Sequence, residues 1–294
     1  MIGIESSKVT FVILHYLVLS ETQNCIKSIQ NRITYKNYQI VIVDNGSNNG
    51  TGEKLIRLHA DDRKIKVICL KKNIGFSAGN NIGYVYAREQ LKSEYIIIIN
   101  NDTEIIQKDF VEKAIECYRD SFYYVLGPDV INLEGVHQSP MKSRIMTEKE
   151  VKKWFIKRYL FSRYLRIHKK LNLPDNFIIY RKYIKNQISK KREILADCKQ
   201  ENVELQGSCL IFSPLYIERC RIAFEELTFL YGEETLLLLR CMKNNWRVMY
   251  NPDLKIRHIE KVATTAFTKN SIDKEIFYTD NQLKAILAIL RQMK

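Results

Sequence analysis

The chain has 294 residues, of which 46% are hydrophobic and 27% are charged, and its formal net charge at pH 7 is +14. This composition is that of a globular protein with a sizeable core, and it excludes a wholly disordered chain and a fibrous repeat protein. The length allows one large domain or two small ones. The positive charge predicts an anionic partner, such as a nucleotide, a nucleic acid or a membrane surface.

The first 126 residues alternate between apolar runs of strand length and segments with helical spacing. Unbroken apolar strands separated by helices are typical of a mostly parallel sheet covered on both faces, where ligands bind at the carboxyl ends of the strands. The predicted strands are 9–16, 38–43, 65–70, 95–99 and 123–126, and the predicted helices are 22–33, 53–60, 77–91 and 108–118.

A basic and aromatic segment follows this alternation. Residues 142–193 contain 17 Lys and Arg but 4 Asp and Glu, so they carry 13 of the 14 net positive charges. We interpret residues 141–200 as a helical insertion in an otherwise near-neutral body. Its aromatic residues are Trp154, Phe155, Tyr159, Phe161, Tyr164, Phe177, Tyr180 and Tyr183.

Two interpretations of this insertion stay open. In the first it lies on an anionic membrane leaflet or holds an anionic acceptor, since each basic residue near such a surface contributes about 1 kcal/mol. In the second it is a pair of solvated helices whose aromatic side chains pack on the main body. On a helical wheel of residues 151–171 the apolar side chains fall on all sides, whereas a helix lying on a membrane should have one clean apolar face.

After the insertion the pattern predicts a strand at 203–212, a helix at 232–244, a short strand at 246–250 and a final helix at 272–293.

The cysteines and the apolar runs predict a cytoplasmic location. The seven cysteines are odd in number and include no CxxC pair, which favours reduced thiols over a disulfide framework or a zinc site. The N-terminal residues lack the pattern of a signal peptide. The most apolar runs, 10–19 and 95–99, are far shorter than the roughly 20 residues that span a bilayer.

Polar residues at the ends of two predicted strands are candidate ligand contacts. Asp44 could accept a hydrogen bond from a nucleobase or a ribose, although Asp-Asn-Gly-Ser is also a good turn sequence. Asn100, Asn101 and Asp102 follow four isoleucines. A carboxylate there could hold Mg²⁺ or Mn²⁺ against a diphosphate, and the alternative is an N-cap for the next helix.

Three further features have a functional and a structural interpretation. Gly75, Gly79 and Gly83 line one helix face, where glycine admits either a ligand or a closely packed strand. Glu233 and Glu234 open a predicted helix, where acidic residues suit the helix dipole, but one of them could be a general base. His258 is a lone histidine, which is more often structural than a ligand.

Several common catalytic motifs are missing from the sequence. It contains no Gly-x-Gly-x-x-Gly, Walker, HExxH or Gly-x-Ser-x-Gly motif, so hydride transfer, P-loop chemistry and triad hydrolysis have no local support.

Taken in order, seven segments resemble the motifs of the family-2 inverting glycosyltransferases of the GT-A fold, especially the rhamnosyltransferase-like branch that builds bacterial surface polysaccharides. They cover nearly the whole chain outside residues 141–200. The segments are FVILHY, VIVDNGSNNGT, NIGFSAGNNIGY, YIIIINNDT, LQGSCLIFSP, FLYGEETLLLLRCMKNNWRVMYNP and IRHIEKVATT.

The resemblance implies an α/β GT-A fold with a Rossmann-like nucleotide-binding sheet. Residues 1–140 would bind the nucleotide sugar, and residues 201–294 would bind the acceptor. Asp44 would contact the nucleobase of a UDP- or dTDP-sugar. The other implied donor-site residues are Gly75, Asn80, Asn81, Asn100, Asn101 and Asp102.

The resemblance also implies the catalytic groups. Asp102 would carry Mg²⁺ or Mn²⁺ with help from His258, and Glu234 would be the base that activates the acceptor. Three positions depart from the usual pattern: Asn100 replaces an Asp, Glu234 replaces an Asp, and His15 stands where Thr is frequent. The residues implied for the acceptor site are Glu233, Gly207 and Ser208.

We therefore expect a metal-dependent, inverting glycosyltransferase. Its acceptor would be a glycan or a glycan on a lipid diphosphate at the inner face of the plasma membrane, with residues 142–193 on the anionic leaflet and no nucleic acid involved. Two alternatives are a nucleic-acid-binding protein and a nucleotidyltransferase; the latter would need a Gly-rich basic loop that residues 17–23 lack.

Overall fold

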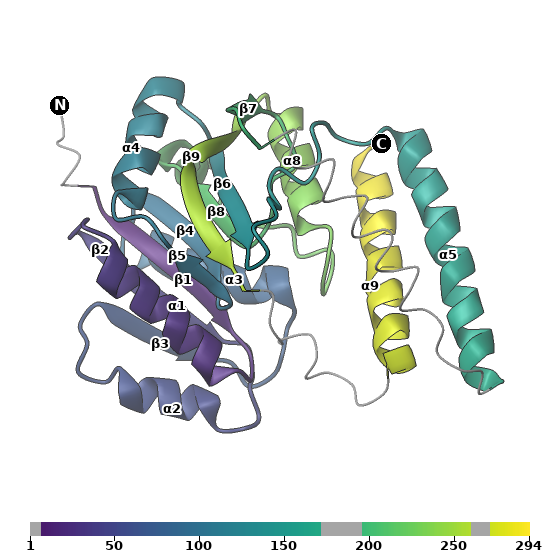
Figure 1. Ribbon diagram of the computed structural model, residues 1–294, viewed down its shortest axis with the longest axis horizontal. Coiled ribbons are helices and arrows are strands. Elements are labelled where there is room, and N and C mark those ends of the chain that lie inside the picture. Colours follow the sequence, from purple (N-terminus) through teal and green to yellow (C-terminus); the bar gives the residue numbers. More distant parts are fainter. Residues whose placement is uncertain (1–6, 172–195, 260–270) are drawn as a thin grey trace.

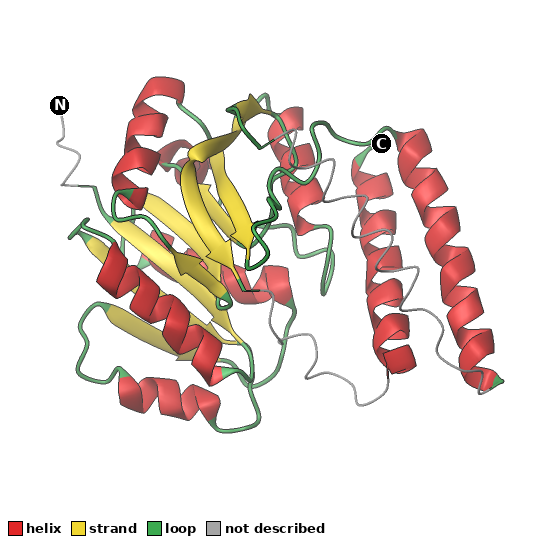
Figure 2. Ribbon diagram, in the orientation of Figure 1, coloured by secondary structure: helices red, strands yellow, loops and turns green. Residues whose placement is uncertain are grey.

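The computed structural model describes residues 7–171, 196–259 and 271–294. A central sheet carries helices on both faces, as the alternation predicted (Figures 1 and 2). The strands are β1 Val9–His15, β2 Tyr38–Asp44, β3 Ile65–Cys69, β4 Tyr95–Asn100, β5 Thr103–Ile105, β6 Val125–Asn132, β7 Gln200–Glu201, β8 Cys209–Phe212 and β9 Val248–His258. The helices are α1 Leu19–Arg32, α2 Thr51–Leu58, α3 Phe76–Glu89, α4 Phe110–Ser121, α5 Glu148–Lys170, α7 Pro214–Arg219, α8 Glu233–Lys243 and α9 Ser271–Gln292.

The strands lie in the order β3-β2-β1-β4-β8-β6-β9-β5, and β7 pairs with β9. The first four of these are parallel to one another, and β6 is parallel to β9. β8 runs antiparallel to both of its neighbours. The carboxyl ends of β1, β2 and β4 therefore meet the start of β8 at one edge of the sheet.

The apolar runs of β1, β2 and β4 are buried because helices cover both faces of these strands. In β2, Ile40 and Ile42 pack into a core with α1 and α4, while Val41 and Val43 pack into a second core with α3, α7 and α8. β-branched residues in such runs suit a pleated surface with neighbours on both faces.

A third layer is formed by α5 and α9, which run side by side at one end of the molecule (Figure 1). Val151 of α5 packs with Leu236 of α8 and with Ile286 and Ile289 of α9. A capping box between Thr147 and Glu150 sets the start of α5. No described helix combines the length and the hydropathy that crossing a membrane requires.

Three sequence predictions were wrong in extent. The strand predicted at 203–212 is only Cys209–Phe212, because Glu204 forms a bridge with Lys142 instead. The strand predicted at 246–250 starts at Val248 and continues to His258, since β6 stays paired with β9 across a register shift after Pro128. The strand predicted at 123–126 likewise extends to Asn132.

Candidate functional site

Two strand ends bring the predicted residues to the same edge of the sheet. β2 ends at Asp44 and β4 ends at Asn100, with β1 between them. The Asn100 N–H donates to the Ser208 carbonyl over 2.8 Å, which joins the end of β4 to the loop before β8. Neighbouring strands lie about 4.8 Å apart, so Asp44 and Asn100 are separated by roughly 10 Å.

Asp44 is held in one orientation at the end of β2. Its side chain is buried, and one oxygen accepts the Ser47 N–H over 3.1 Å. A side chain on Gly52 would overlap the other oxygen, so only glycine fits at that position in α2. Burial raises the pKa of the Asp44 carboxyl, and the hydrogen bonds from Ser47 oppose this shift. The hydrogen bond from Ser47 is one that the turn interpretation predicts, and the other Asp44 oxygen lies against Gly52.

His15 braces the neighbouring strand end rather than facing a ligand. Its ring nitrogens contact the hydroxyls of Thr22 in α1 and Thr51 in α2 at 2.7 and 2.9 Å. Burial lowers the pKa of the imidazole to about 4, so the ring is neutral at physiological pH. His15 thus ties the starts of two helices to β1.

Asn45 positions the loop that contains Gly75, and the sequence analysis did not identify it. The Asn45 amide donates to the Asn73 side chain and to the Gly75 carbonyl, and its oxygen accepts the Ile74 N–H. Gly75 has a φ of +93°, and a side chain there would overlap Phe229. No local pattern distinguishes Asn45 from an ordinary turn asparagine.

The remaining polar and glycine positions of α3 serve mainly in packing. Asn81 uses its whole side-chain amide on the loop that follows α7: it donates to Phe224 and Glu226 and accepts the Phe224 N–H. Side chains at Gly79 and Gly83 would overlap residues of β1, so tight helix–sheet packing explains these two glycines. Asn80 is buried, and its oxygen has no hydrogen-bond donor.

Asp102 and His258 form a pair because β5 folds back onto β9. The ladder places Thr103 opposite His258, and the Ile259 N–H donates to the Asp102 carbonyl over 2.9 Å. Asp102 Oδ1 lies 3.4 Å from His258 Nε2, and the two side chains are 16% and 12% exposed. This oxygen is buried, and none of the described residues donates a hydrogen bond to it.

Gln138 determines which ring nitrogen of His258 faces Asp102. His258 Nδ1 lies 2.8 Å from Gln138 Oε1, which accepts a hydrogen bond, so Nδ1 carries the proton. In the neutral ring the Nε2 lone pair then points toward the Asp102 carboxylate. His258 Nε2 and the Asp102 carboxylate thus face each other, and an imidazole nitrogen beside a carboxylate is a donor set that can bind a divalent cation. Among the described residues no third acidic, His or Cys ligand joins them.

Glu234 lies against Gly207, next to the Ser208 whose carbonyl accepts the Asn100 N–H. It belongs to the first turn of α8, and its carboxylate touches Gly207, whose N–H hydrogen-bonds to it. Apolar side chains of Leu205 and Leu237 line a small void beside it. Burial raises the pKa of the Glu234 carboxyl to about 7, and the negative charge of Glu204 adds to the shift.

Two further acidic residues surround Glu234. Glu233 is buried, and one of its oxygens has no donor in the part of the chain that the structure describes. Burial together with the Glu234 charge raises the pKa of Glu233 well above the usual value. Glu204 is neutralised by Lys142, whose ammonium lies 2.6 and 2.8 Å from its two oxygens. Lys142 belongs to the basic segment in the sequence, yet its ammonium group pairs with a carboxylate of this acidic cluster.

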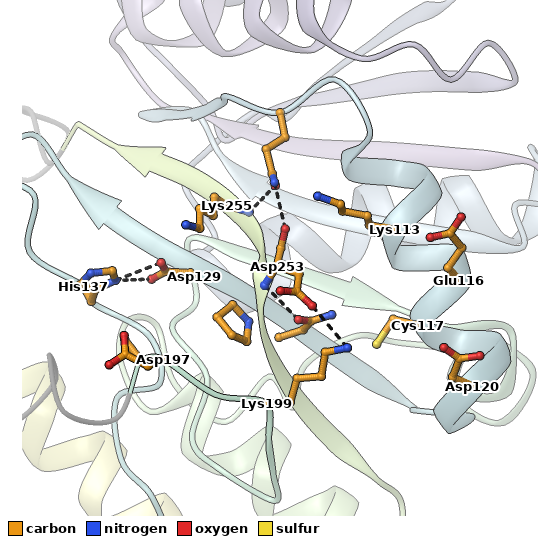
Figure 3. Close-up of a pocket in the computed structure, with 14 residues that line it drawn as sticks. Lys113, Glu116, Cys117, Asp120, Asp129, His137, Asp197, Lys199, Asp253 and Lys255 are labelled. Carbon is orange, nitrogen blue, oxygen red and sulfur yellow. Dashed lines mark hydrogen bonds and ion pairs between the residues drawn. The ribbon is translucent and has the colours of Figure 1, made fainter.

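A separate cavity lies between α4, β6 and β9. It has a volume of about 710 Å³, and none of the residues predicted for the site lines it (Figure 3). The buried Asp129 carboxylate accepts hydrogen bonds from His137 on one wall, and Lys199 pairs with Asp253 on another. His137 precedes Gln138, so the loop that lines this cavity also carries the residue that orients His258.

Solved structures of TarS from S. aureus have the same fold. TarS 1–349 superposes with a TM-score of 0.53 at 15% sequence identity, over 86% of this chain and 60% of that one. The complex of TarS 1–349 with UDP-GlcNAc gives 0.55 at 14% identity, over 94% of this chain and 65% of that one. The architecture is therefore the GT-A fold that the motifs predicted.

Sequence relatives and a family model give the same assignment. The chain is 28% identical over 133 residues to the low-salt glycan biosynthesis hexosyltransferase Agl10 of Haloferax volcanii, and 34% identical over 107 residues to the dTDP-rhamnosyl transferase RfbF of Shigella flexneri. These matches cover 45% and 36% of this chain and only 40% and 34% of the relatives. The model of glycosyl transferase family 2 matches residues 10–187, and this match extends into the basic segment. The chain belongs to glycosyl transferase family 2.

Proposed function

We propose that this protein transfers a sugar from a UDP- or dTDP-sugar to a glycan or lipid-diphosphate-linked acceptor, with inversion at the anomeric carbon. One observation carries the proposal: in a family-2 chain, Asp102 of the Asp102–His258 pair follows the strand end at Asn100, and the Asn100 N–H donates to Ser208, whose neighbour Gly207 contacts the buried Glu234 carboxylate. The relative named as a dTDP-rhamnosyl transferase and the TarS complex with UDP-GlcNAc support this choice of donors.

The donor would lie along the carboxyl ends of β2 and β4. In this arrangement Asp44 contacts the nucleobase and Asn100, Asn101 and Asp102 lie beside the diphosphate. Asn101 is already oriented, since its amide donates to Thr22 over 3.2 Å. Gly75 and Asn80 are on the loop and first turn that border this edge.

Asp102 and His258 would hold Mg²⁺ or Mn²⁺. The unpaired Asp102 oxygen and the lone pair of His258 Nε2 suit a hard divalent cation that takes its other ligands from phosphates and water. The bound cation would offset the charge that develops on the departing nucleoside diphosphate. The chain's own contribution is to present these two ligands in a fixed orientation.

Glu234 would act as the general base. Its carboxylate takes the proton of the acceptor hydroxyl while that oxygen forms a bond to the anomeric carbon and the bond from this carbon to the diphosphate breaks. A pKa of about 7 leaves a sizeable fraction of the carboxylate ionised at neutral pH and makes it a stronger base than a solvated Glu. Glu233, Gly207 and Ser208 would border the acceptor.

A donor screen tests the proposal. We expect UDP or dTDP, with Mn²⁺, to raise the melting temperature of the full chain more than GDP or CDP does. The matching radiolabelled nucleotide sugar should then transfer its sugar to a lipid-linked glycan acceptor. A chain that none of the four nucleotides stabilises, with or without Mn²⁺, would contradict the proposed donor class.

Gln138 is expected to position His258 for the cation. Replacing Gln138 with Leu removes the acceptor of the Nδ1 proton, so the ring loses its preference for that tautomer. We expect ¹⁵N NMR to show the Nδ1–H tautomer in the wild type and a mixture in the variant. Mn²⁺ affinity should fall about 10- to 100-fold, which is the usual effect of losing such an outer hydrogen bond.

Gln107→Leu is the matched control for this substitution. Gln107 also braces β9, through the Asp253 carbonyl and the Lys255 N–H, but it does not contact His258. It should leave the His258 resonances and Mn²⁺ binding unchanged. An Nε2–H tautomer in the wild-type protein would show that Gln138 does not play this role.

Gly207→Ala should displace the catalytic carboxylate without unfolding the protein. The added methyl group would overlap Glu234 Oε1. Overpacking of this kind costs about 1–3 kcal/mol. Because the Glu234 carboxylate must pay this cost to reach its catalytic position, we expect transfer to slow by about tenfold or more. Gly83→Ala, which overlaps Val12 far from any carboxylate, should lower the melting temperature but keep the wild-type pH–rate profile. An identical profile in both variants would contradict the contact between Gly207 and the base.

A further inference from the structure

We propose that the outward face of α5 lies on the surface of an anionic lipid bilayer; this inference rests on the proposed function only in that the acceptor would be lipid-linked. The face is defined by the α5 stripe, which consists of Ile156, Leu160, Tyr164, Ile167 and Leu171. These side chains are between 49% and 62% exposed. Six of the fourteen large hydrophobic side chains that are exposed in the described ranges lie between Ile156 and Leu171.

The stripe lies on one side of the helix. Its members follow one another at intervals of four, four, three and four residues, which matches the 3.6-residue turn. At 1.5 Å per residue the stripe is roughly 22 Å long. Within the part of the chain that the structure describes, α5 is the outermost helix, and α9 lies between it and the rest of the molecule (Figure 1).

The helix has a second apolar face, which packs inward. Val151 and Leu165 are fully buried, and Val151 packs with α8 and α9 while Trp154 and Phe155 cover the same cluster. A helical wheel drawn from the sequence shows the inward and the outward apolar residues together, so apolar residues occupy all sides of the wheel. The structure separates them: one face packs on the rest of the fold, and the other is exposed.

Basic residues flank the α5 stripe. From Val151 to Lys170 the helix has eight Lys and Arg and no Asp or Glu. Arg166 and Lys169 pair with Asp280 and Asp273 of α9. Other basic side chains are exposed; they include Lys153, Lys157 and Arg163. An apolar stripe with basic flanks is the composition of helices that lie at a membrane interface, and tyrosines such as Tyr164 are enriched there.

Charge argues against two other occupants. A second copy of this face would bring two sets of Lys and Arg together, and the helix has no acidic partner for them between Val151 and Lys170. A nucleic acid would satisfy the charges, but protein–phosphate contacts leave exposed Ile and Leu side chains in water. An anionic bilayer accommodates both features, because headgroups neutralise the basic flanks and acyl chains cover the stripe.

Vesicle co-sedimentation of the full chain tests the proposal. We expect binding to phosphatidylcholine vesicles that contain phosphatidylglycerol, and much weaker binding to phosphatidylcholine alone. A variant with Ile156→Gln, Leu160→Gln and Ile167→Gln keeps the charge and should bind at least about tenfold more weakly, since each buried aliphatic side chain contributes about that factor. A variant with Lys153→Gln, Lys157→Gln and Arg163→Gln should lose the preference for anionic vesicles.

Ile56→Gln with Leu58→Gln is the matched control, because these α2 side chains are 47% and 60% exposed but the short α2 has only two basic residues, Lys54 and Arg57, beside the acidic Glu53. It should bind vesicles like the wild type. Circular dichroism and the melting shift with nucleotide show whether each variant is folded. Equal vesicle binding by the stripe variant and the wild type would overturn the proposal, as would tighter binding to an RNA oligonucleotide that the stripe variant loses. If the protein binds vesicles but no nucleotide raises its melting temperature, the proposed function is overturned and the proposal that α5 binds the bilayer stands.

Discussion

Glu234→Gln should abolish sugar transfer while the protein still binds the donor nucleotide. The amide keeps the size of the side chain and can still accept the Gly207 N–H, but it cannot take a proton from the acceptor. General bases contribute roughly 10²- to 10⁴-fold, so we expect transfer to fall by about 1,000-fold. Transfer measured with radiolabelled donor, together with nucleotide binding by calorimetry, checks both parts.

The same substitution should make the protein more stable at high pH. Burial raises the pKa of Glu234 from 4.5 in the unfolded chain to about 7 in the folded one, so the folded state binds more protons in this window. Its stability therefore falls as the pH rises through the window, and the cost is fully present above about 7. A pKa that is higher by 1 in the folded state corresponds to a cost of about 1.4 kcal/mol, and Gln removes this cost because it does not ionise.

Denaturant unfolding at several pH values measures this effect. The variant and the wild type should be equally stable below pH 4.5 and diverge as the pH approaches 7. Glu148→Gln, in the first turn of α5 on the surface, is the control and should preserve transfer. Undiminished turnover by Glu234→Gln would rule out this base. A wild-type pH–rate profile that does not fall below about pH 7 would argue against its raised pKa.

Asp102→Asn should remove the metal dependence of nucleotide binding. The variant loses the buried anionic oxygen that faces His258, and its amide N–H can donate to the Nε2 lone pair, so the fold should be retained. We expect Mn²⁺ to bind at least about 100-fold more weakly, and transfer to fall with it. Manganese EPR and calorimetry of UDP or dTDP with and without Mn²⁺ measure the change.

Asp120→Asn on α4 is the control for this substitution because Asp120 lines the separate cavity beside β9. It should titrate with Mn²⁺ like the wild type. A Mn²⁺ titration of Asp102→Asn that matches the wild type would contradict the assignment of Asp102 as a ligand, and the Gln138 prediction would then lose its basis in metal binding.

Much of the fold follows from residue patterns along the chain. The apolar runs of β1, β2 and β4 are nearly unbroken because both faces of these strands are buried, and the spacing in α1 places Cys25, Ile26 and Ile29 inward. The element boundaries were less accurate where long-range pairing decided them. β5 is only three residues long, and it exists because β9 extends past its predicted end to pair with it.

The sequence predicted candidate ligand residues of the site but not the residues that hold them in position. Asp102 and His258 could be named from their motifs, whereas Asn45 and Gln138 carry no local signal. Each acts on residues that are close only in space: Gln138 is 120 positions away from His258. The second half of the basic segment, residues 172–193, lies outside the described residues, so the expectations placed on it remain predictions.

The sequence by itself determined the alternation of strands and helices, the strand ends where polar residues gather and the concentration of charge in one segment. These properties depend on residues that are close together in the sequence, because an apolar strand or a helical repeat can be recognised within a few consecutive positions. Only the tertiary structure decided which face of α5 is covered, which nitrogen of His258 faces Asp102 and which carboxylates are shielded from water. These depend on contacts between residues far apart in the chain, which no local pattern records.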